Sequence, residues 1–191
     1  MKTVKGTRTE KNLLTSFAGE SQARNRYDFF AKQAQKDGYQ QIAAIFEETA
    51  LHEYQHARRM FECLAGGMVE ITATYPAGKV GSTLENLEAA AGGEHEEWSE
   101  LYPEFARIAR EEGFEQVARM YENICVSERH HEERFRALAE LVKNQTMFSR
   151  PEAVSWTCRK CGYTHYGAEP PKACPACAHP QAYFERKQEQ W

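Results

Sequence analysis

The chain has 191 residues, of which 41% are hydrophobic, and this is enough to form the core of one or two globular domains. Its 24 basic and 28 acidic residues give a formal net charge of −4, which does not indicate a nucleic-acid-binding protein. It holds no run of 18 apolar residues and no apolar segment behind its basic start, so we expect a cytoplasmic protein with neither a transmembrane helix nor a secretory signal.

The first half of the chain is predicted to begin with two helices, near residues 10–36 and 39–65. Gly38 lies between them and suits the tight turn of a helical hairpin. Apolar residues recur every three or four positions along both helices, which is typical of a face that packs in a core. We therefore expect an antiparallel helix pair with one buried face on each member.

A long connection leads to a third predicted helix. Residues 66–81 exceed the usual length of a bundle turn, so we predict a crossover that runs along the bundle. The third helix is expected near residues 82–112, with a cap at Ser82 or Thr83 and a kink at Pro103.

A fourth helix is predicted near residues 114–145, and it completes an internal repeat. A shift of 75 positions places Gly38 on Gly113 and His56 on His131, whereas the shift is 74 near the start of each half. Two such halves predict a mainly α-helical four-helix bundle with one long crossover.

Composition changes near residue 150, where the bundle is expected to end. Residues 1–147 hold two prolines, whereas the last 41 residues hold five prolines and four of the six cysteines. Helix interiors exclude proline, and small metal-bound ribbons tolerate it. We predict a helical domain over residues 1–147 and a small metal-binding domain over residues 148–191, with a linker near residues 149–152.

Seven acidic or imidazole side chains lie on the apolar helix faces: Glu20, Glu53, His56, Glu94, Glu97, Glu128 and His131. Four of them form two Glu-x-x-His motifs, one in each half, and residues three positions apart share one helix face. Five carboxylates in one core require cations, and carboxylate with imidazole suits iron or manganese. We predict a site for two metal ions, because this set is the pattern of carboxylate-bridged bundles.

Other polar side chains of the helices are expected to lie outside this site. Three histidines fall off the apolar faces and are expected in solvent: His52, His95 and His130. Cys63 and Cys125 are expected as small core residues. The hydroxyls of Tyr27 and Tyr102 either bond a ligand carboxylate or simply pack in the core, and the sequence leaves both possibilities open.

The C-terminal region carries two Cys-x-x-Cys pairs: Cys158, Cys161, Cys174 and Cys177. Two such pairs place four thiolates around one tetrahedral metal ion in a reducing compartment. The spacing alone favours zinc, whereas a redox-active di-metal site in the same chain favours iron, which delivers electrons singly.

Together these motifs resemble those of the rubrerythrin family, in the form that has a C-terminal rubredoxin-like domain. The resemblance covers nearly the whole chain, although Ala178 stands where a glycine usually follows the last cysteine. It implies a ferritin-like bundle with an oxo-bridged di-iron centre and a separate iron held by the four cysteines. That makes three iron ions per chain, with zinc as a possible substitute.

The resemblance also implies individual roles for the seven candidate ligands, which would be the catalytic residues. Glu53 and Glu128 would bridge the two irons. The terminal ligands would be these three residues: Glu20, Glu94 and His131. His56 and Glu97 would compete for the other iron as its oxidation state changes.

The function implied by the resemblance is reduction of hydrogen peroxide in oxidative-stress defence, with electrons entering through the four-cysteine iron. The donor would be a rubredoxin or an NAD(P)H-linked reductase, since the chain has no glycine-rich dinucleotide motif of its own. A head-to-tail homodimer would shorten the electron path. Two alternatives stay open, namely a ferritin-type protein that oxidises and stores iron, and a non-catalytic module stabilised by zinc.

Overall fold

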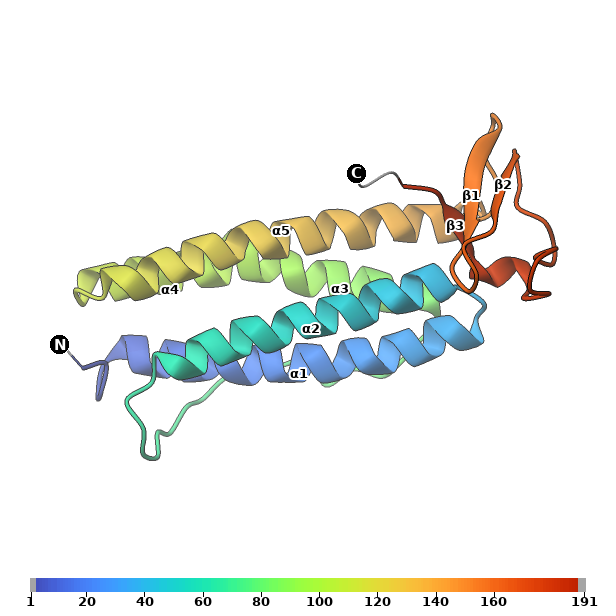
Figure 1. Cartoon of the computed structure of the whole chain (residues 1–191). Coiled ribbons are helices and arrows are strands. Elements are labelled where there is room, and N and C mark those ends of the chain that lie inside the picture. The colour runs from blue at the N-terminus through green and yellow to red at the C-terminus, as the bar shows by residue number, and fades with distance from the viewer. Residues whose placement is uncertain (1–2, 189–191) are drawn as a thin grey trace.

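The computed structural model describes residues 3–188, and its larger part is an elongated four-helix bundle (Figure 1). The third member of the bundle, α3–α4, is interrupted by a π-helical segment, η1. The helices have these bounds: α1 Arg8–Lys36, α2 Gln40–Glu62, α3 Thr83–Glu96, η1 Glu97–Leu101, α4 Tyr102–Glu111 and α5 Glu115–Lys143. The predicted helical bundle of the ferritin-like type is confirmed.

Glycine ends the first helix of each hairpin, as the sequence predicts. Gly38 and Gly113 have φ angles of 86° and 78°, a left-handed conformation that only glycine adopts without strain. Ser82 is the N-cap of α3 and forms a capping box with Glu85. The two hairpins, α1–α2 and α3–α4–α5, therefore begin and end close to the predicted positions.

The predicted crossover joins the hairpins. The chain leaves α2 at one end of the bundle and returns along α1 to the start of α3 at the other end (Figure 1). Tyr75 fixes this segment, because its hydroxyl donates a hydrogen bond to the Thr15 carbonyl of α1 at 2.8 Å. The two hairpins consequently pack side by side with one long connection.

The third predicted helix contains an insertion before Pro103. The second half of the repeat has one more residue than the first half between the matching positions Glu94 and Gly113. The π-helical turn of η1 accommodates such an extra residue. Pro103 lies in the first turn of α4, where a missing N–H costs little. The expected kink at Pro103 is thus a π-helical segment that ends just before it.

Two apolar clusters fill the bundle and leave a polar layer between them. One is centred on Phe46 and Phe135, and the other on Met60 and Tyr121, all four of which are fully buried. On every helix the predicted acidic ligands fall between the residues of the first cluster and those of the second. The two clusters therefore close this layer at both of its ends along the bundle axis.

The C-terminal region is a three-stranded antiparallel sheet in the order β2-β1-β3, built around buried Trp156 and Phe184. Its elements have these bounds: β1 Val154–Cys158, β2 Thr164–Gly167, the 3-10 helix η2 Gln181–Tyr183 and β3 Phe184–Arg186. The sheet lies at the end of the bundle where α1 turns into α2 (Figure 1). Ala182 lies against Gly38 of that turn.

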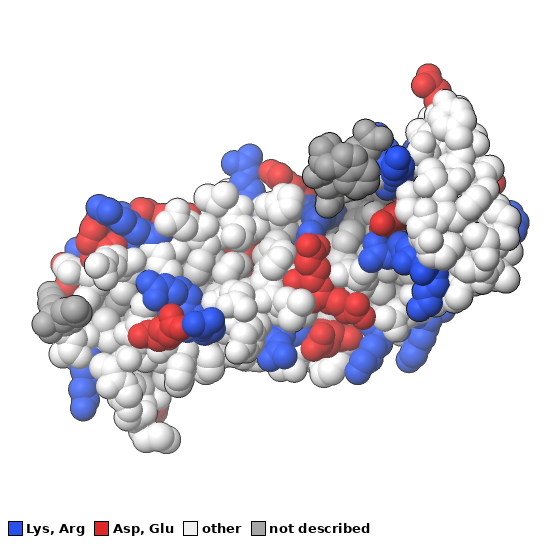
Figure 2. Space-filling view, in the orientation of Figure 1, with Lys and Arg blue, Asp and Glu red and all other residues white. Residues whose placement is uncertain are grey.

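Cationic and anionic side chains alternate over the face of the molecule seen in Figure 2. Exposed ion pairs occur along the helices, such as that between Arg110 and Glu122 at 2.8 Å. Pairs of this kind add at most about 1 kcal/mol each to stability. Within the described residues, no helix combines the length and the apolar character needed to cross a membrane.

Candidate metal centres

Side chains from both hairpins converge in the polar layer of the bundle. They form two groups whose ligand atoms lie within 4.8 Å of one another. The first group is Glu20, Glu53, His56 and Glu128, and the second is Glu53, Glu94, Glu128 and His131. Glu53 and Glu128 belong to both groups, which is the arrangement of two carboxylates that bridge a pair of ions.

The distances within the groups are short. Nδ1 of His56 lies 3.0 Å from Glu53 Oε2 and 2.9 Å from Glu128 Oε1. Nδ1 of His131 lies 2.9 Å from Glu128 Oε2 and 3.3 Å from Glu53 Oε1. Both imidazoles therefore direct Nδ1 toward the same two carboxylates.

Six buried atoms of this cluster make no hydrogen bond within the described part of the chain: Glu20 Oε2, Glu53 Oε1, Glu94 Oε2, both carboxylate oxygens of Glu128, and His131 Nδ1. Buried polar atoms without partners are costly, and native proteins rarely keep them. These six converge on one place, and oxygen with imidazole nitrogen is the donor set preferred by iron and manganese. The residues fit a di-iron site.

The pKa values of the metal-free cluster also indicate a site for cations. Burial disfavours charge on His131 and His56, but the carboxylates of Glu128 and Glu53 beside them outweigh it and raise their pKa values to about 12 and about 10. Burial and the charge of Glu53 raise the pKa of Glu94 to about 8, and burial and neighbouring carboxylates also raise that of Glu20. The two histidines beside it overcome burial and lower the pKa of Glu53 to about 2. In the metal-free cluster, raised pKa values thus favour bound protons at positions where metal ions would otherwise balance the carboxylate charge.

The two tyrosines bond candidate ligands of the opposite hairpin. The Tyr27 hydroxyl on α1 donates a hydrogen bond to Glu94 Oε1 on α3. The Tyr102 hydroxyl on α4 donates one to Glu20 Oε1 on α1, at 2.5 Å. In each glutamate the bonded oxygen faces the tyrosine, and the other oxygen, Oε2, is left for the site. Of the two possibilities that the sequence left open, the structure shows the hydrogen bond.

Glu97 lies apart from both groups of ligand atoms. It begins the π-helical segment and is half-buried. Burial and the charges of Glu94 and Glu128 raise its pKa well above the ordinary value, and it in turn raises the pKa of Glu20. Glu97 therefore lies near the cluster without belonging to either group of ligand atoms. His56, in contrast, directly contacts the shared carboxylates Glu53 and Glu128.

One histidine expected in solvent is part of the site surroundings instead. His52 is half-buried, and its Nδ1 lies 3.1 Å from Nε2 of His131, so the prediction of an exposed His52 is wrong. Its spacing of four residues from His56 placed it on a neighbouring part of the same helix face, a signal that the apolar pattern alone did not use. The prediction for His130, which is exposed, is confirmed.

Sequence reasoning also missed a polar node beside η1. Buried Glu132 on α5 accepts hydrogen bonds from Trp98 Nε1 at 2.5 Å, from His95 at 3.1 Å and from Arg136 at 2.6 Å. His95 remains half-exposed, with 48% of its side chain accessible. The node ties the segment that carries Glu97 to α5. Cys63 and Cys125 are half-buried against the apolar cluster, as predicted.

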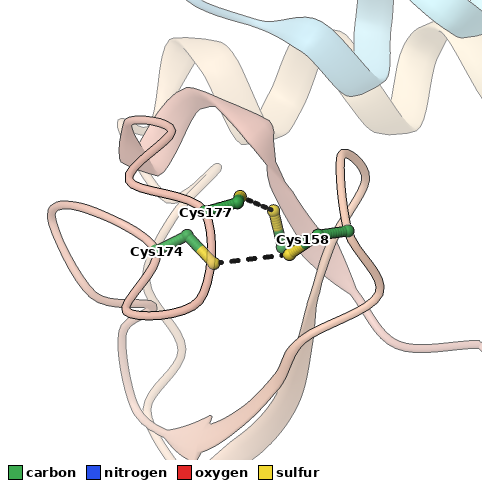
Figure 3. A group of neighbouring side chains, drawn as sticks. Cys158, Cys174 and Cys177 are labelled. Atoms are coloured by element: carbon green, nitrogen blue, oxygen red, sulfur yellow. Dashed lines mark hydrogen bonds between the residues drawn. The ribbon is translucent and has the colours of Figure 1, made fainter.

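The four cysteines of the C-terminal region form the second centre. Their sulfur atoms face one another from two loops (Figure 3), with Cys158 to Cys177 at 3.8 Å and Cys161 to Cys174 at 3.6 Å. Four sulfurs at about 2.3 Å from a tetrahedral ion lie about 3.8 Å apart, so the spacing fits a single metal ion.

Each Cys-x-x-Cys pair is followed by a residue of positive φ. Gly162 has a φ of 76° and Ala178 a φ of 59°, and their amides donate to the carbonyls of Cys158 and Cys174 at 2.9 and 2.8 Å. The two loops are therefore alike in spite of the alanine. Burial of the Cys174 sulfur is outweighed by amides donating to it, which lower its pKa to about 7 and favour the metal-binding thiolate.

Comparison with known proteins agrees with both centres. The family profile described as rubrerythrin matches residues 11–139, and the profile described as the rubrerythrin rubredoxin-like domain matches residues 156–185. The rubrerythrin of Nitratidesulfovibrio vulgaris is 56% identical over 185 residues, or 97% of each chain. That of Porphyromonas gingivalis is 56% identical over 184 residues, which is 96% of this chain and 92% of the relative.

Solved structures show the same architecture. Fully reduced, all-ferrous nigerythrin superposes with a TM-score of 0.64 at 31% identity, covering 97% of this chain and 92% of the other. A bacterioferritin of Desulfovibrio desulfuricans superposes with a TM-score of 0.63 at 24% identity, covering 73% of this chain and 82% of the other. The second likeness concerns the fold of the bundle alone.

Proposed function

The chain belongs to the rubrerythrin family, with a di-iron site and a four-cysteine site, and from that premise we propose that it is a hydrogen peroxide reductase. The observation that carries the proposal is the presence in one chain of a buried carboxylate–imidazole cluster and a separate cluster of four cysteines. The first suits a two-electron reaction at two irons, and the second suits delivery of single electrons.

The reaction consumes two electrons and two protons for each peroxide, H2O2 + 2e⁻ + 2H⁺ → 2H2O. Two bound irons would supply the electrons and the Lewis acidity for cleavage of the O–O bond. The residues would hold the ions as the resemblance assigns them. Glu53 and Glu128 would hold both ions, and the other ligands would be these: Glu20, Glu94, His131, and His56 or Glu97.

The surrounding residues keep this arrangement dry and oriented. The apolar clusters around Phe135 and Tyr121 close the site on both sides. Tyr27 and Tyr102 each hold one oxygen of a terminal carboxylate, so that the second oxygen keeps its direction. Burial and the charges of Glu94 and Glu128 raise the pKa of Glu97, which favours its protonated form in the metal-free protein. It is therefore our candidate donor of one of the two protons.

The positions of the two sites support a head-to-tail homodimer. The four-cysteine domain packs at the start of α2, and Glu53 lies 13 residues farther along that helix, a rise of about 20 Å. Two antiparallel copies would bring the four cysteines of one chain toward the bundle centre of the other. Sedimentation equilibrium tests this, and a fully active monomer contradicts it.

The electrons would come from a rubredoxin or an NAD(P)H-linked reductase in the cytoplasm and would serve oxidative-stress defence. Electrons would enter at the four-cysteine site and then reach the bundle site. A protein with zinc in place of iron at the four cysteines separates these steps. We expect it to react once with peroxide after chemical reduction, but not to turn over with a protein donor.

The decisive experiment is stopped-flow reoxidation. The iron-loaded chain is reduced without oxygen and then mixed with hydrogen peroxide or with dissolved oxygen, while its visible absorbance is followed. Stoichiometric reoxidation by peroxide, with a far slower reaction with oxygen, supports the proposal. Preferential reaction with oxygen, together with oxidation of added ferrous iron, replaces it with the ferritin-type function.

A further inference from the structure

His131 is contacted on both of its ring nitrogens. On one side, Nδ1 faces the carboxylates of Glu128, Glu53 and Glu94 at 2.9, 3.3 and 3.5 Å. On the other side, Nε2 lies 3.1 Å from Nδ1 of His52 on α2, and the two rings are nearly parallel, at 10°. His52 therefore joins α2 to the imidazole of α5 from outside the ligand cluster.

The direction of this hydrogen bond follows from the chemistry of the site. A ring nitrogen that binds a cation carries no proton, so a neutral His131 that binds through Nδ1 has its proton on Nε2. A doubly protonated imidazole also has a proton on Nε2, because both of its ring nitrogens then carry one. In both states His131 donates and His52 Nδ1 accepts. His52 consequently carries its own proton on Nε2 and is uncharged.

The other imidazole of the site lacks such a partner. The repeat shift of 75 positions pairs His56 with His131, and it pairs His52 with Ser127. Within residues 3–188, Ser127 makes no hydrogen bond to His56, and Nε2 of His56 has no hydrogen-bond partner. The side chain of His56 is 14% exposed, against 2% for His131. The two halves of the repeat thus hold their histidines differently.

We propose that His52 is a positioning residue, which fixes the ring of His131 and keeps the proton on its Nε2, so that Nδ1 is always presented to the site. Of the two imidazoles of the site, only His131 is held in this way within residues 3–188. A neutral acceptor also leaves His131 a neutral ligand, whereas a carboxylate in its place would draw the Nε2 proton and increase the negative charge of the site. The proposal rests on the proposed function only in treating the bundle cluster as a metal site.

Manganese binding tests this role without reference to peroxide. One equivalent of Zn(II) fills the four cysteines of the full chain, and Mn(II), which prefers oxygen and nitrogen donors, is then titrated while free Mn(II) is followed by electron paramagnetic resonance. His52→Phe keeps a ring but removes the acceptor, and we expect about 10- to 100-fold weaker binding at the tighter site. His52→Asn keeps an acceptor near the position of Nδ1 and should restore most of the affinity.

The matched control is His130→Phe, at the exposed histidine next to His131, which should bind Mn(II) like the wild type. A second readout is nuclear magnetic resonance of the histidine-labelled chain loaded with diamagnetic Zn(II) at all sites. A slowly exchanging imidazole N–H of His131 is expected in the wild type and in His52→Asn, and its loss is expected in His52→Phe.

Equal Mn(II) affinities of the wild type and His52→Phe would overturn the proposal, as would a protected His131 N–H that persists in His52→Phe. Equal weakening by His130→Phe would overturn it as well, since the effect would then not depend on the hydrogen bond. These outcomes leave the peroxide reaction untouched. Conversely, a chain that fails to react with peroxide but loses Mn(II) affinity in His52→Phe refutes the proposed function and retains the role of His52.

Discussion

Binding of two metal ions in the bundle is predicted to release about four protons at pH 7. In the metal-free protein the pKa values of His131 and His56 are raised to about 12 and about 10, and that of Glu94 to about 8. Burial raises the pKa of Glu20 well above its ordinary value, which favours its protonated form, whereas the pKa of Glu53 is lowered to about 2. Ligation requires neutral imidazole and ionised carboxylate, and each of the four groups must therefore lose one proton.

The sign and size of the pH dependence follow from this count. All four groups hold protons more tightly than usual, so protons compete with the cations and the affinity rises with pH. Each proton released changes the binding free energy by about 1.4 kcal/mol per pH unit. Four protons correspond to a roughly 10⁴-fold increase per pH unit in the overall constant for both ions. Above pH 8 the slope decreases toward three, because Glu94 has by then lost its proton.

Isothermal titration calorimetry measures the protons directly. Mn(II) is added to protein that already holds Zn(II) at the four cysteines, in buffers of different ionisation enthalpy, and the slope of the observed heat gives the number released. His56→Gln removes one of the four groups and should release about three. Glu133→Gln, at an exposed position of α5, should release the same number as the wild type. Release of one proton or none, or an affinity that is constant between pH 6 and 8, would refute the reasoning.

Three further substitutions test the surroundings of the two centres. Tyr102→Phe leaves Glu20 Oε1 buried without its donor and should lower the unfolding free energy of the metal-free protein by about 1–3 kcal/mol in urea; an unchanged midpoint would contradict this. Phe135→Ala empties a fully buried site that packs on Phe46 and should cost about 3–5 kcal/mol with an unchanged m value, and a loss below 1 kcal/mol would contradict the packing. Ala178→Gly relieves a φ of 59°, by up to about 1 kcal/mol, and should slow metal loss to a chelator; faster loss would show that the alanine is not strained.

The helices and most of the bundle site could be predicted because the spacing of residues along each helix alone indicates which of its faces is buried. Glu53 and Glu128 lie on apolar faces with spacings of three and four, so burial of the face buries them as well. Glycine at 38 and 113 has a conformational reason to end a helix. Such features need no knowledge of which helix packs against which.

Contacts between helices were not accessible in that way. The contact of His52 with His131 depends on the axial register and rotation of α2 against α5, which the pattern of either helix alone does not specify. The same is true of Glu132, whose partners Trp98 and His95 come from the third member of the bundle. The π-helical segment, in contrast, is detectable in the sequence. The repeat shift rises from 74 to 75 between Glu94 and Gly113, and one inserted residue inside a continuous helix requires a bulge.

Three departures from the repeat lie around the metal site, and they bear on what the bundle does. Two identical halves would offer two equal imidazoles and two equal sets of carboxylates. Here the second half adds one residue in η1, places Glu97 where the first half has Ala23, and supplies Ser127 where the first half has His52. Each difference makes the surroundings of His56 unlike those of His131. A site that only stored cations would gain nothing from unequal positions, whereas a site that changes oxidation state benefits from one fixed ligand and one that can exchange.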